Sequence, residues 1–134
     1  MDRTDYQILN ILQMDCRTTL KHIGDQVGLT APAVSERVRR MEEKGVIRNF
    51  RIEVDRERLD CSMTGFIFVA VEPEKYSTFC DFCQKTPAIV SHYHVIGVFN
   101  ALLRFAVRGT RELDELLSSI KRYGDSQTSV ELKT

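Results

Sequence analysis

The chain has 134 residues, a mass of 15.4 kDa, and 19 basic and 19 acidic side chains. With 43% hydrophobic and 28% charged residues, this composition excludes a disordered chain and suits one ordinary domain or two small ones. No apolar run approaches the ~20 residues that span a bilayer, and the polar start MDRTDYQ is not a signal peptide. We therefore expect a cytoplasmic protein without a membrane partner, in which the four cysteines are reduced.

The first two helices are predicted from capping residues and helical spacing. One begins after Thr4, with Gln7 placed to complete a capping box, and the next begins after Thr19 and ends at Gly28. The second helix turns three apolar side chains to one side, namely Leu20, Ile23 and Val27. Gly24 lies on that side, which predicts the close approach of another helix.

A third helix is predicted to begin after Thr30, to tolerate Pro32 in its first turn and to end at Gly45. Its apolar residues recur at i, i+4 and i+7 and must face inward: Val34, Val38 and Met41. Residues 37–51 hold six basic side chains against two acidic ones, although the whole chain is neutral. Positive charge is therefore local, and an anionic partner must be met at this helix.

Three short helices with a tight turn between the second and third predict a helix-turn-helix that binds double-stranded DNA. Small and polar side chains lead the third helix toward base edges, while arginine and lysine suit phosphates. The predicted DNA-binding residues are Thr30, Ala33, Ser35, Glu36, Arg37, Arg39, Arg40, Lys44 and Arg48. Residues 46–54 alternate imperfectly, as expected for a short exposed strand or wing. The competing interpretation is a helix with a solvated charged face.

The second half of the chain follows another pattern. We expect a DNA-binding domain at 1–54, a polar linker at 55–61 and a second domain at 62–134. The predicted elements of the second domain are strands 62–71, 89–95, 101–107 and 128–133 and helices 75–86 and 111–123. This β-α-β-β-α-β order is ferredoxin-like. The predicted fold class is α+β, a winged helix-turn-helix domain followed by a ferredoxin-like βαββαβ domain.

The first strand of this second domain is apolar on both faces. One face carries Ile67, Val69 and Val71, and the other carries Phe66, Phe68 and Ala70. Two helices cover only one face of a four-stranded sheet, so we expect a second copy of the domain to cover the other. In the third strand, Leu103, Phe105 and Val107 are expected to face the helices, and Leu102, Arg104 and Ala106 the partner.

Two stretches resemble a known family. TDYQILNILQMDCRTTLKHIGDQVGLTAPAVSERVRRMEEKGVIRNFRIEVD, with its motif GLTAPAVSERVRRMEEKGVI, resembles the N-terminal domain of the Lrp/AsnC (feast/famine) transcription regulators. VIGVFNALLRF lies in a second half that resembles the family's effector-binding and oligomerisation domain. The resemblance covers nearly the whole chain. It implies a nucleoid-associated bacterial or archaeal regulator that forms homodimers and often octamers, with an amino acid or related small molecule bound near residues 96–100.

The chain departs from the family at that turn. The family usually has Thr-Gly-acid-aromatic-Asp there, whereas this chain has Ile96, Gly97, Val98, Phe99 and Asn100. Both acidic positions are gone, so no carboxylate at these two positions is available for a ligand's ammonium group. Whether the effector differs or is missing stays open at this point.

A zinc site is the first alternative to weigh, because Cys80 and Cys83 form a CxxC and His92 and His94 follow in sequence. A buried helix face explains both thiols better, since Tyr76, Phe79, Cys80 and Cys83 recur at helical spacing. Strand parity predicts that both histidines lie on the sheet face away from the helices, as interface residues. We expect no metal and no cofactor.

Two further alternatives concern function. Some haem-pathway decarboxylases resemble the same family, but the sequence offers no catalytic constellation, so we expect no enzyme activity. An architectural protein that wraps DNA with little sequence preference fits the few base-reaching side chains as well as a specific regulator does.

Overall fold

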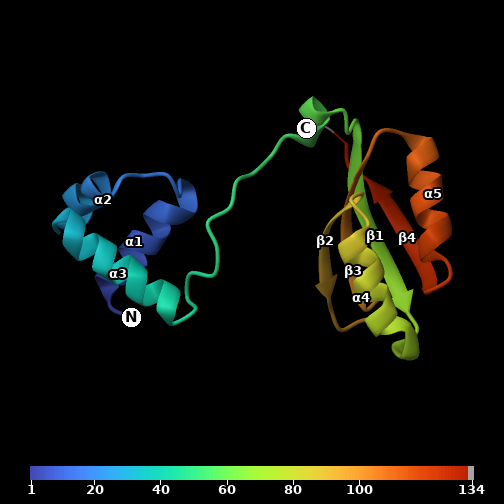
Figure 1. The fold of residues 1–134 in the computed structure, drawn as a ribbon, viewed down its shortest axis with the longest axis horizontal. Helices are drawn as coiled ribbons and strands as arrows, with labels where there is room; N and C mark the ends of the chain where they lie inside the picture. Colours follow the sequence, from blue (N-terminus) through green and yellow to red (C-terminus); the bar gives the residue numbers. More distant parts are fainter. Residues whose placement is uncertain (133–134) are drawn as a thin grey trace. The chain divides into compact units, whose positions relative to one another are not determined.

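The computed structural model describes residues 1–132, and the chain divides into two compact units, residues 1–53 and residues 54 onward (Figure 1). Each unit has its own hydrophobic core. Among the described residues, no helix is long and apolar enough to cross a membrane.

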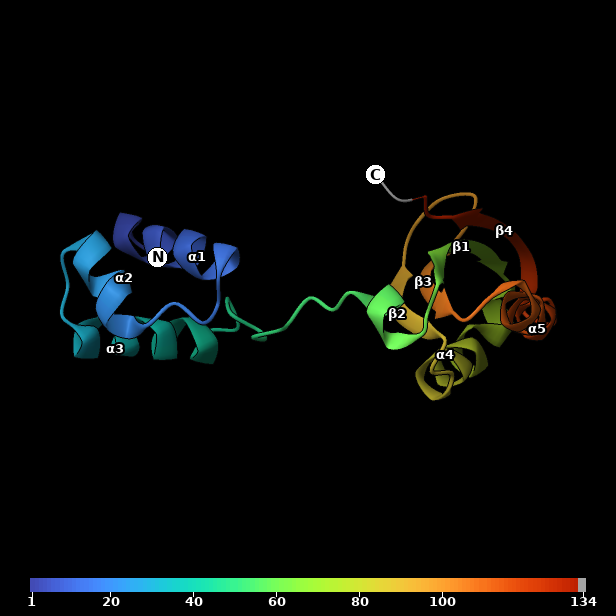
Figure 2. The ribbon, with the colours of Figure 1, turned by 90° about the horizontal axis from the view of Figure 1, so that it is seen from above.

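Three helices form the first unit: α1 (Arg3–Met14), α2 (Leu20–Val27) and α3 (Ala31–Glu43). Figure 2 shows α1 and α2 packed against α3. Four fully buried side chains from all three helices make the core, namely Ile8, Ile23, Val34 and Met41. The apolar spacing of the third predicted helix therefore predicted the burial of Val34 and Met41 correctly.

The caps of the helices are partly as predicted. Thr19 and Thr30 are confirmed as N-caps, and each hydroxyl accepts a hydrogen bond from a backbone N–H in the following turn. The N-cap of α1 is Asp2, however, and Thr4 already lies inside the helix. The Asp2 carboxylate accepts from the Asp5 N–H at 2.8 Å, and the Asp5 carboxylate accepts from the Asp2 N–H at 3.1 Å. Two aspartates thus form the capping box that Thr4 and Gln7 were predicted to form.

Close approach at Gly24 comes from the turn and not from another helix. A Cβ atom on Gly24 would lie 2.3 Å from the carbonyl oxygen of Leu29, so the glycine lets the α2–α3 turn fold back. Gly28 ends α2 in the left-handed conformation, with φ of +74°. Leu20 is 39% exposed, whereas Ile23, on the same predicted side of the helix, is fully buried.

The predicted wing is wrong as well. No strand is assigned between residues 46 and 54, although this segment lies within the described chain. The backbone N–H groups of Val46 and Ile47 donate to the carbonyl of Met41 and close the end of α3. A strand needs a hydrogen-bonding neighbour, and alternation of residue types cannot supply one. The predicted linker contains a short 3-10 helix, η1 (Arg56–Leu59), which Asp55 caps.

The second unit is a four-stranded antiparallel sheet with two α-helices. Its strands are β1 (Met63–Val71), β2 (Ile89–His94), β3 (Ala101–Val107) and β4 (Gly124–Val130), and their spatial order is β2-β3-β1-β4. Helix α4 (Tyr76–Lys85) follows the short 3-10 helix η2 (Pro73–Lys75), and α5 (Thr110–Ile120) precedes β4. The ferredoxin-like order is therefore confirmed. Strand β4 begins four residues before the predicted start at 128, and predicted strand residue 133 lies outside the described residues.

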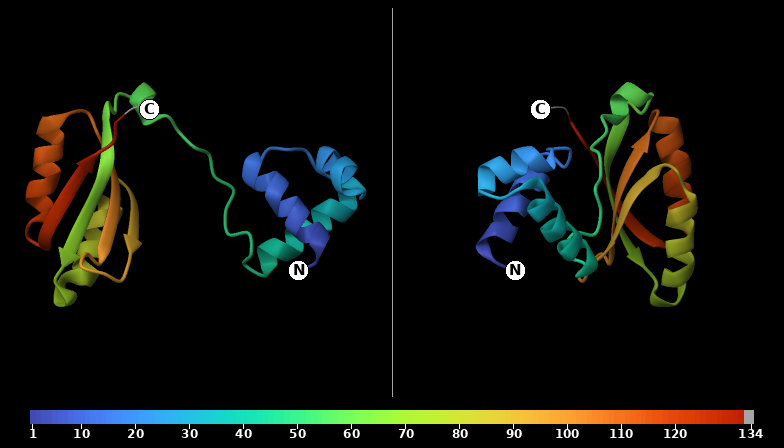
Figure 3. Two further views of the ribbon diagram at one scale, coloured as in Figure 1. Left: turned by 180° about the vertical axis from the view of Figure 1, so that it is seen from behind. Right: turned by 60° about the vertical axis from the view of Figure 1, so that its left-hand side comes forward.

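Both helices cover one face of the sheet (Figure 3). In β3 the side chains predicted to face the helices are buried, namely Leu103, Phe105 and Val107. In β1 the buried face is that of Ile67, Val69 and Val71. They pack against α4 and α5 through Phe79, Leu116 and Ile120. The other face carries half-buried Phe66, Phe68 and Leu102, together with exposed Arg104.

Strand β2 contains an irregularity that the sequence did not predict. Ile89 lies opposite Phe105, but Ser91 lies opposite Arg104, so Val90 is an extra residue in the ladder. Such a bulge shifts the side-chain alternation by one position for the rest of the strand.

The bulge turns His92 and His94 toward α4. The Tyr76 hydroxyl lies 2.8 Å from His92 Nε2, and the His94 ring stacks on the Tyr76 ring with centroids 3.9 Å apart. The prediction that both histidines face away from the helices, at an interface with a partner, is therefore wrong. Burial and the neighbouring His94 lower the pKa of His92.

Candidate nucleic-acid interface

Burial of one side of α3 determines what the helix presents to solvent. Val34 and Met41 are fully buried and Val38 is half-buried, so the opposite side of the helix faces outward. Four predicted DNA-binding residues are exposed on this helix, namely Ser35, Glu36, Arg39 and Arg40. They form one exposed surface with the start of the helix, where Thr30 is exposed and Ala33 is half-buried. The Thr30 hydroxyl caps the Ala33 N–H and Pro32 has no N–H, so the start of α3 adds small side chains to this surface and few free backbone donors.

Arg39 is held by carboxylates of its own helix. Its Nη2 and Nε donate to the two carboxylate oxygens of Glu36 at 2.6 and 3.0 Å, and its Nη1 donates to Glu43. Hydrogen bonding to Arg39 lowers the pKa of Glu36. The same hydrogen bond raises the pKa of Arg39 above its usual range, so both groups are charged at neutral pH.

The other side chains predicted to contact phosphate form a weaker ion pair within the protein than Arg39 does, or none among the described residues. Arg40 Nε lies 3.8 Å from a Glu36 oxygen, which is a weak exposed pairing. Lys44 and Arg48 are exposed, and in the described part of the chain neither forms an ion pair. The structure therefore leaves three cations available along the end of α3 and the segment after it.

Arg37 lies differently from the other arginines, because it is turned toward α1. Its Nη1 donates to both Asp2 carboxylate oxygens at 2.7 and 2.8 Å and to an Asp5 oxygen at 3.0 Å. The hydrogen bond from Arg37 is the main cause that lowers the pKa of Asp2 to about 2. The Asp2–Asp5 capping hydrogen bond, with help from Arg37, lowers the pKa of Asp5. Arg37 thus ties the start of α1 to the middle of α3.

The predicted effector turn is fixed by Asn100. Its side chain accepts a hydrogen bond from the Val71 N–H at 2.8 Å and donates to the Val71 carbonyl at 2.9 Å. Its backbone N–H donates to the carbonyl of Val69. At the tip, Ile96 is fully exposed and Val98 is 89% exposed. The turn therefore presents apolar side chains, while the amide that replaces the family's aspartate is already used within the fold.

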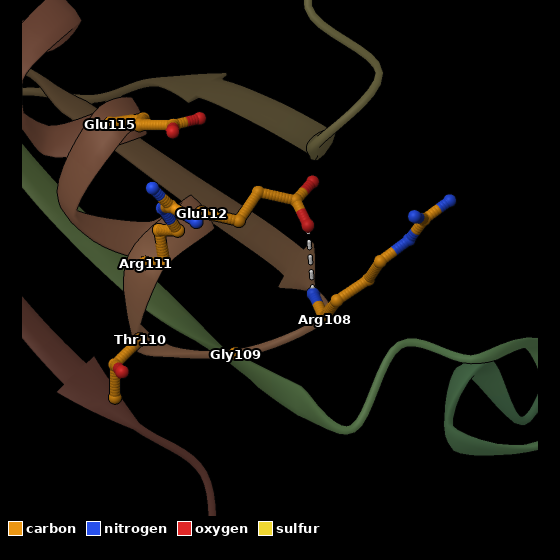
Figure 4. Close-up of a pocket in the computed structure, with 6 residues that line it drawn as sticks. All are labelled: Arg108, Gly109, Thr110, Arg111, Glu112 and Glu115. Carbon is orange, nitrogen blue, oxygen red and sulfur yellow. Dashed lines mark hydrogen bonds between the residues drawn. The ribbon is translucent and has the colours of Figure 1, made fainter.

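A pocket of the second unit lies elsewhere. It has a volume of about 610 Å³ and surrounds the start of α5 (Figure 4). The Glu112 carboxylate accepts a hydrogen bond from the Arg108 N–H at 3.0 Å within it. Its lining residues are Arg108, Gly109, Thr110, Arg111, Glu112 and Glu115, which include none of the residues of the predicted effector turn.

The cysteines of α4 belong to the hydrophobic core and its edge. Cys83 is buried, and burial raises the pKa of its thiol to about 12, so it is a protonated thiol at neutral pH. Cys80 is half-buried, and both are free thiols. Among the described residues, no group of three or more metal-ligating side chains comes together.

Comparisons with known proteins agree with this arrangement. Residues 1–42 match the AsnC-type helix-turn-helix domain, and residues 64–134 match the Lrp/AsnC ligand binding domain. The chain is 34% identical over 137 residues to the HTH-type transcriptional regulator FL11 of Pyrococcus horikoshii, a match that covers 100% of this chain and 91% of that protein. It is 30% identical over 134 residues to the uncharacterized HTH-type transcriptional regulator YezC of Bacillus subtilis, covering 100% and 95%.

Solved structures extend the likeness to the fold. LrpC of Bacillus subtilis superposes with a TM-score of 0.90 at 25% identity, covering 100% of this chain and 96% of that one. The transcriptional regulator NMB0573 of Neisseria meningitidis, solved in complex with L-Met, superposes with a TM-score of 0.89 at 22% identity, covering 99% and 90%.

The family domains and the relatives are those of DNA-binding regulators, which removes the decarboxylase alternative. The chain belongs to the Lrp/AsnC family and is a transcriptional regulator of that type.

Proposed function

We propose that this regulator binds specific DNA sequences by placing α3 in the major groove. The observation that carries the proposal is the outward surface of α3, where exposed polar and basic side chains follow a helix start that carries small side chains. Thr30, Ala33, Ser35 and Glu36 are short enough, or polar enough, to read base edges. Arg39, Arg40, Lys44 and Arg48 contact phosphates on either side of the groove.

Arg37 takes a supporting part in this proposal in place of a phosphate contact. Its three hydrogen bonds to Asp2 and Asp5 hold α3 at a fixed angle to α1. A fixed angle matters because base contacts need side chains in register with the base pairs.

Selection of bound sequences from random duplexes tests the sequence-specific function. The wild type is expected to enrich a defined site, and Ser35→Ala is expected to change the preference by roughly 1–3 kcal/mol at one or two base pairs. A wild type that enriches no sequence would instead support the architectural, DNA-wrapping alternative. A uniform loss of affinity in the variant would contradict base reading by Ser35.

We also propose that the protein is a homodimer that assembles further, up to an octamer. Support comes from the uncovered sheet face, where Phe66, Phe68 and Leu102 are half-buried and apolar. A second copy stacked on this face would cover it and would supply a second helix-turn-helix for a two-fold DNA site.

The two units are proposed to divide the work. Residues 1–54 bind DNA, residues 55–61 link, and residues 62–134 dimerise and bind an effector in the cytoplasm of a bacterial or archaeal cell, on the nucleoid. The relatives named above come from Bacillus and Pyrococcus.

The effector is proposed to be a small molecule, an amino acid or a relative of one, bound at the turn of residues 96–100. The ligand-binding domain match and the L-Met complex of the Neisseria relative support this. Val98 offers no carboxylate, and the Asn100 side chain is hydrogen-bonded to the Val71 backbone. The turn therefore offers no negatively charged partner at these two positions for the ammonium group of a ligand.

Thermal-shift titrations with α-amino acids should give weaker responses in the wild type than in Val98→Asp. Equal responses in both proteins would contradict a role of this position in ligand binding.

A further inference from the structure

Glu36 accepts from two of the five N–H donors of Arg39. Two nitrogens of the Arg39 guanidinium donate to the two Glu36 oxygens at 2.6 and 3.0 Å, and the third donates to Glu43. Glu36 also lies 3.8 Å from Nε of Arg40. One carboxylate at the middle of α3 thus faces both arginines that are proposed to bind phosphate.

These pairings balance charge at the middle of α3 in the free protein, whereas Lys44 and Arg48 form no ion pair among the described residues. Two arginines and two glutamates, Glu36 and Glu43, balance in charge, and all four side chains are about half exposed. Ion pairs with this exposure are weak and exchange readily. A phosphate must therefore compete with Glu36 and Glu43 for Arg39, and this competition is weakest when Glu36 has another partner.

The major groove offers a carboxylate only a limited choice of partners. The N4 amino group of cytosine is a donor that a glutamate accepts from, whereas the N7 and O6 atoms of guanine and the O4 atom of thymine are acceptors. Adenine presents an acceptor beside its amino group, which suits an amide better than a carboxylate. Away from cytosine, Glu36 would face acceptors and phosphates, and it is better paired with Arg39.

We propose that Glu36 makes the phosphate contact of Arg39 conditional on a cytosine at the base pair that Glu36 faces. This inference rests on the proposed function of α3. With cytosine, Glu36 leaves Arg39 and accepts from N4, and the freed guanidinium binds the adjacent phosphate. Without cytosine, Glu36 stays hydrogen-bonded to Arg39. The complex then lacks both the contact of Glu36 with a base and the contact of Arg39 with the phosphate. Glu36 is thus a specificity-determining residue that acts partly through Arg39.

Glu42 provides a matched control on the same helix. It is exposed and carries the same charge, and in the described chain it forms no ion pair with an arginine. Glu36→Gln and Glu42→Gln therefore change the net charge equally, and only the first releases Arg39 from a carboxylate.

The test measures the affinity of the full-length wild type, Glu36→Gln, Glu42→Gln, Arg39→Ala and the Glu36→Gln/Arg39→Ala double variant. Each binds random duplex DNA and the selected site at about 50 and 200 mM salt. Glu36→Gln should bind random DNA more tightly than Glu42→Gln does, with a salt slope steeper by up to about one. That slope corresponds to about three- to fourfold more affinity loss across this salt range. Sites selected by Glu36→Gln should have adenine in place of cytosine at the base pair that residue 36 faces, because the glutamine amide pairs with adenine.

The gain on random DNA should disappear when Arg39 is alanine. Equal affinities of Glu36→Gln and Glu42→Gln on random DNA would overturn the inference, as would a gain that persists in the double variant. These outcomes leave the proposed function standing if Arg39→Ala weakens binding. If Arg39→Ala binds the selected site with the same affinity as the wild type, the proposed phosphate contact and the inference both fail.

Discussion

Arg37 and Arg39 lie two positions apart on α3 and do different things. Arg37 donates three hydrogen bonds to the start of α1, whereas Arg39 pairs only with glutamates of its own helix. Both arginines lie in one basic segment of the sequence. Their different roles cannot be predicted from that segment, because the partners of Arg37 are Asp2 and Asp5, which lie far away in the sequence. Only the packing of α1 on α3 brings those carboxylates within reach.

Arg37→Ala should therefore lower the thermal stability of the DNA-binding unit. The change removes an ion-pair network that links two helices, so the melting temperature should fall by a few degrees at low salt and by less at high salt. Arg40→Ala is the control, because its pairing at 3.8 Å is local and exposed. Thermal unfolding followed by circular dichroism checks this, and equal melting temperatures of the two variants would show that Arg37 does not stabilise the fold.

Asp2 makes the stability of the folded protein depend on pH, with less stability at low pH. Its pKa in the folded protein is about 2, below the ordinary value of 3.8, so its charged form stabilises the fold. This contribution is complete above about 3.8 and is lost as the pH falls through about 2. Asp2→Asn keeps a side chain that caps helices well but removes the charge. Its deficit in melting temperature should be largest above this range and shrink as the pH falls to about 2. A deficit that is constant with pH would contradict the ion pair with Arg37.

At the scale of elements, the sequence predicts most helices and strands and misses those features that depend on neighbours. The three helices of the first unit follow from apolar spacing and, for α2 and α3, from threonine caps, and the order of elements in the second follows from its residue patterns. The bulge at Val90 reverses the orientation of His92 and His94, and no residue type in β2 announces it. The failed wing has a similar cause, since residues 46–54 have the alternation of a strand but no partner strand.

Gly24 couples α2 to the turn that positions α3. A Cβ atom there would lie 2.3 Å from the Leu29 carbonyl oxygen, so Gly24→Ala must displace the turn. The helix propensity of alanine favours the variant by about 1 kcal/mol, but overpacking costs about 1–3 kcal/mol. We expect a net loss of stability in chemical denaturation and weaker DNA binding.

Gly28→Ala is the matched control for Gly24→Ala, because its added Cβ atom causes no steric clash and strains only the backbone conformation. A Cβ atom there meets nothing within 4 Å, and its cost comes from the left-handed backbone at φ of +74° alone. If Gly24→Ala proves as stable as the wild type, the close approach of the turn to α2 is not needed for folding.

At the scale of the whole molecule, a neutral chain can bind DNA because its charges are distributed unevenly. Residues 37–51 hold six basic side chains against two acidic ones, and dimerisation would present two such segments to one duplex. The uncovered sheet face of the second unit is the surface proposed to join the two copies.

Leu102→Glu should dissociate the dimer. Leu102 lies opposite Phe68 in the sheet, on the face without helices, and a buried unpaired carboxylate there is costly only if a partner covers it. Ser118→Glu adds the same charge on exposed α5 as a control. Light scattering should show a lower mass for Leu102→Glu alone, and its DNA affinity should fall with the loss of the second helix-turn-helix. An unchanged mass would place the dimer interface elsewhere.

The central claim is that the outward side of α3 binds DNA through its arginines, and the salt dependence of DNA binding by Arg39→Ala tests it most directly. The account predicts weaker binding to the selected site and a salt slope on that site that is shallower than the wild-type slope by about one, as expected for the loss of one phosphate contact. An affinity at low salt and a slope that both equal those of the wild type would contradict it.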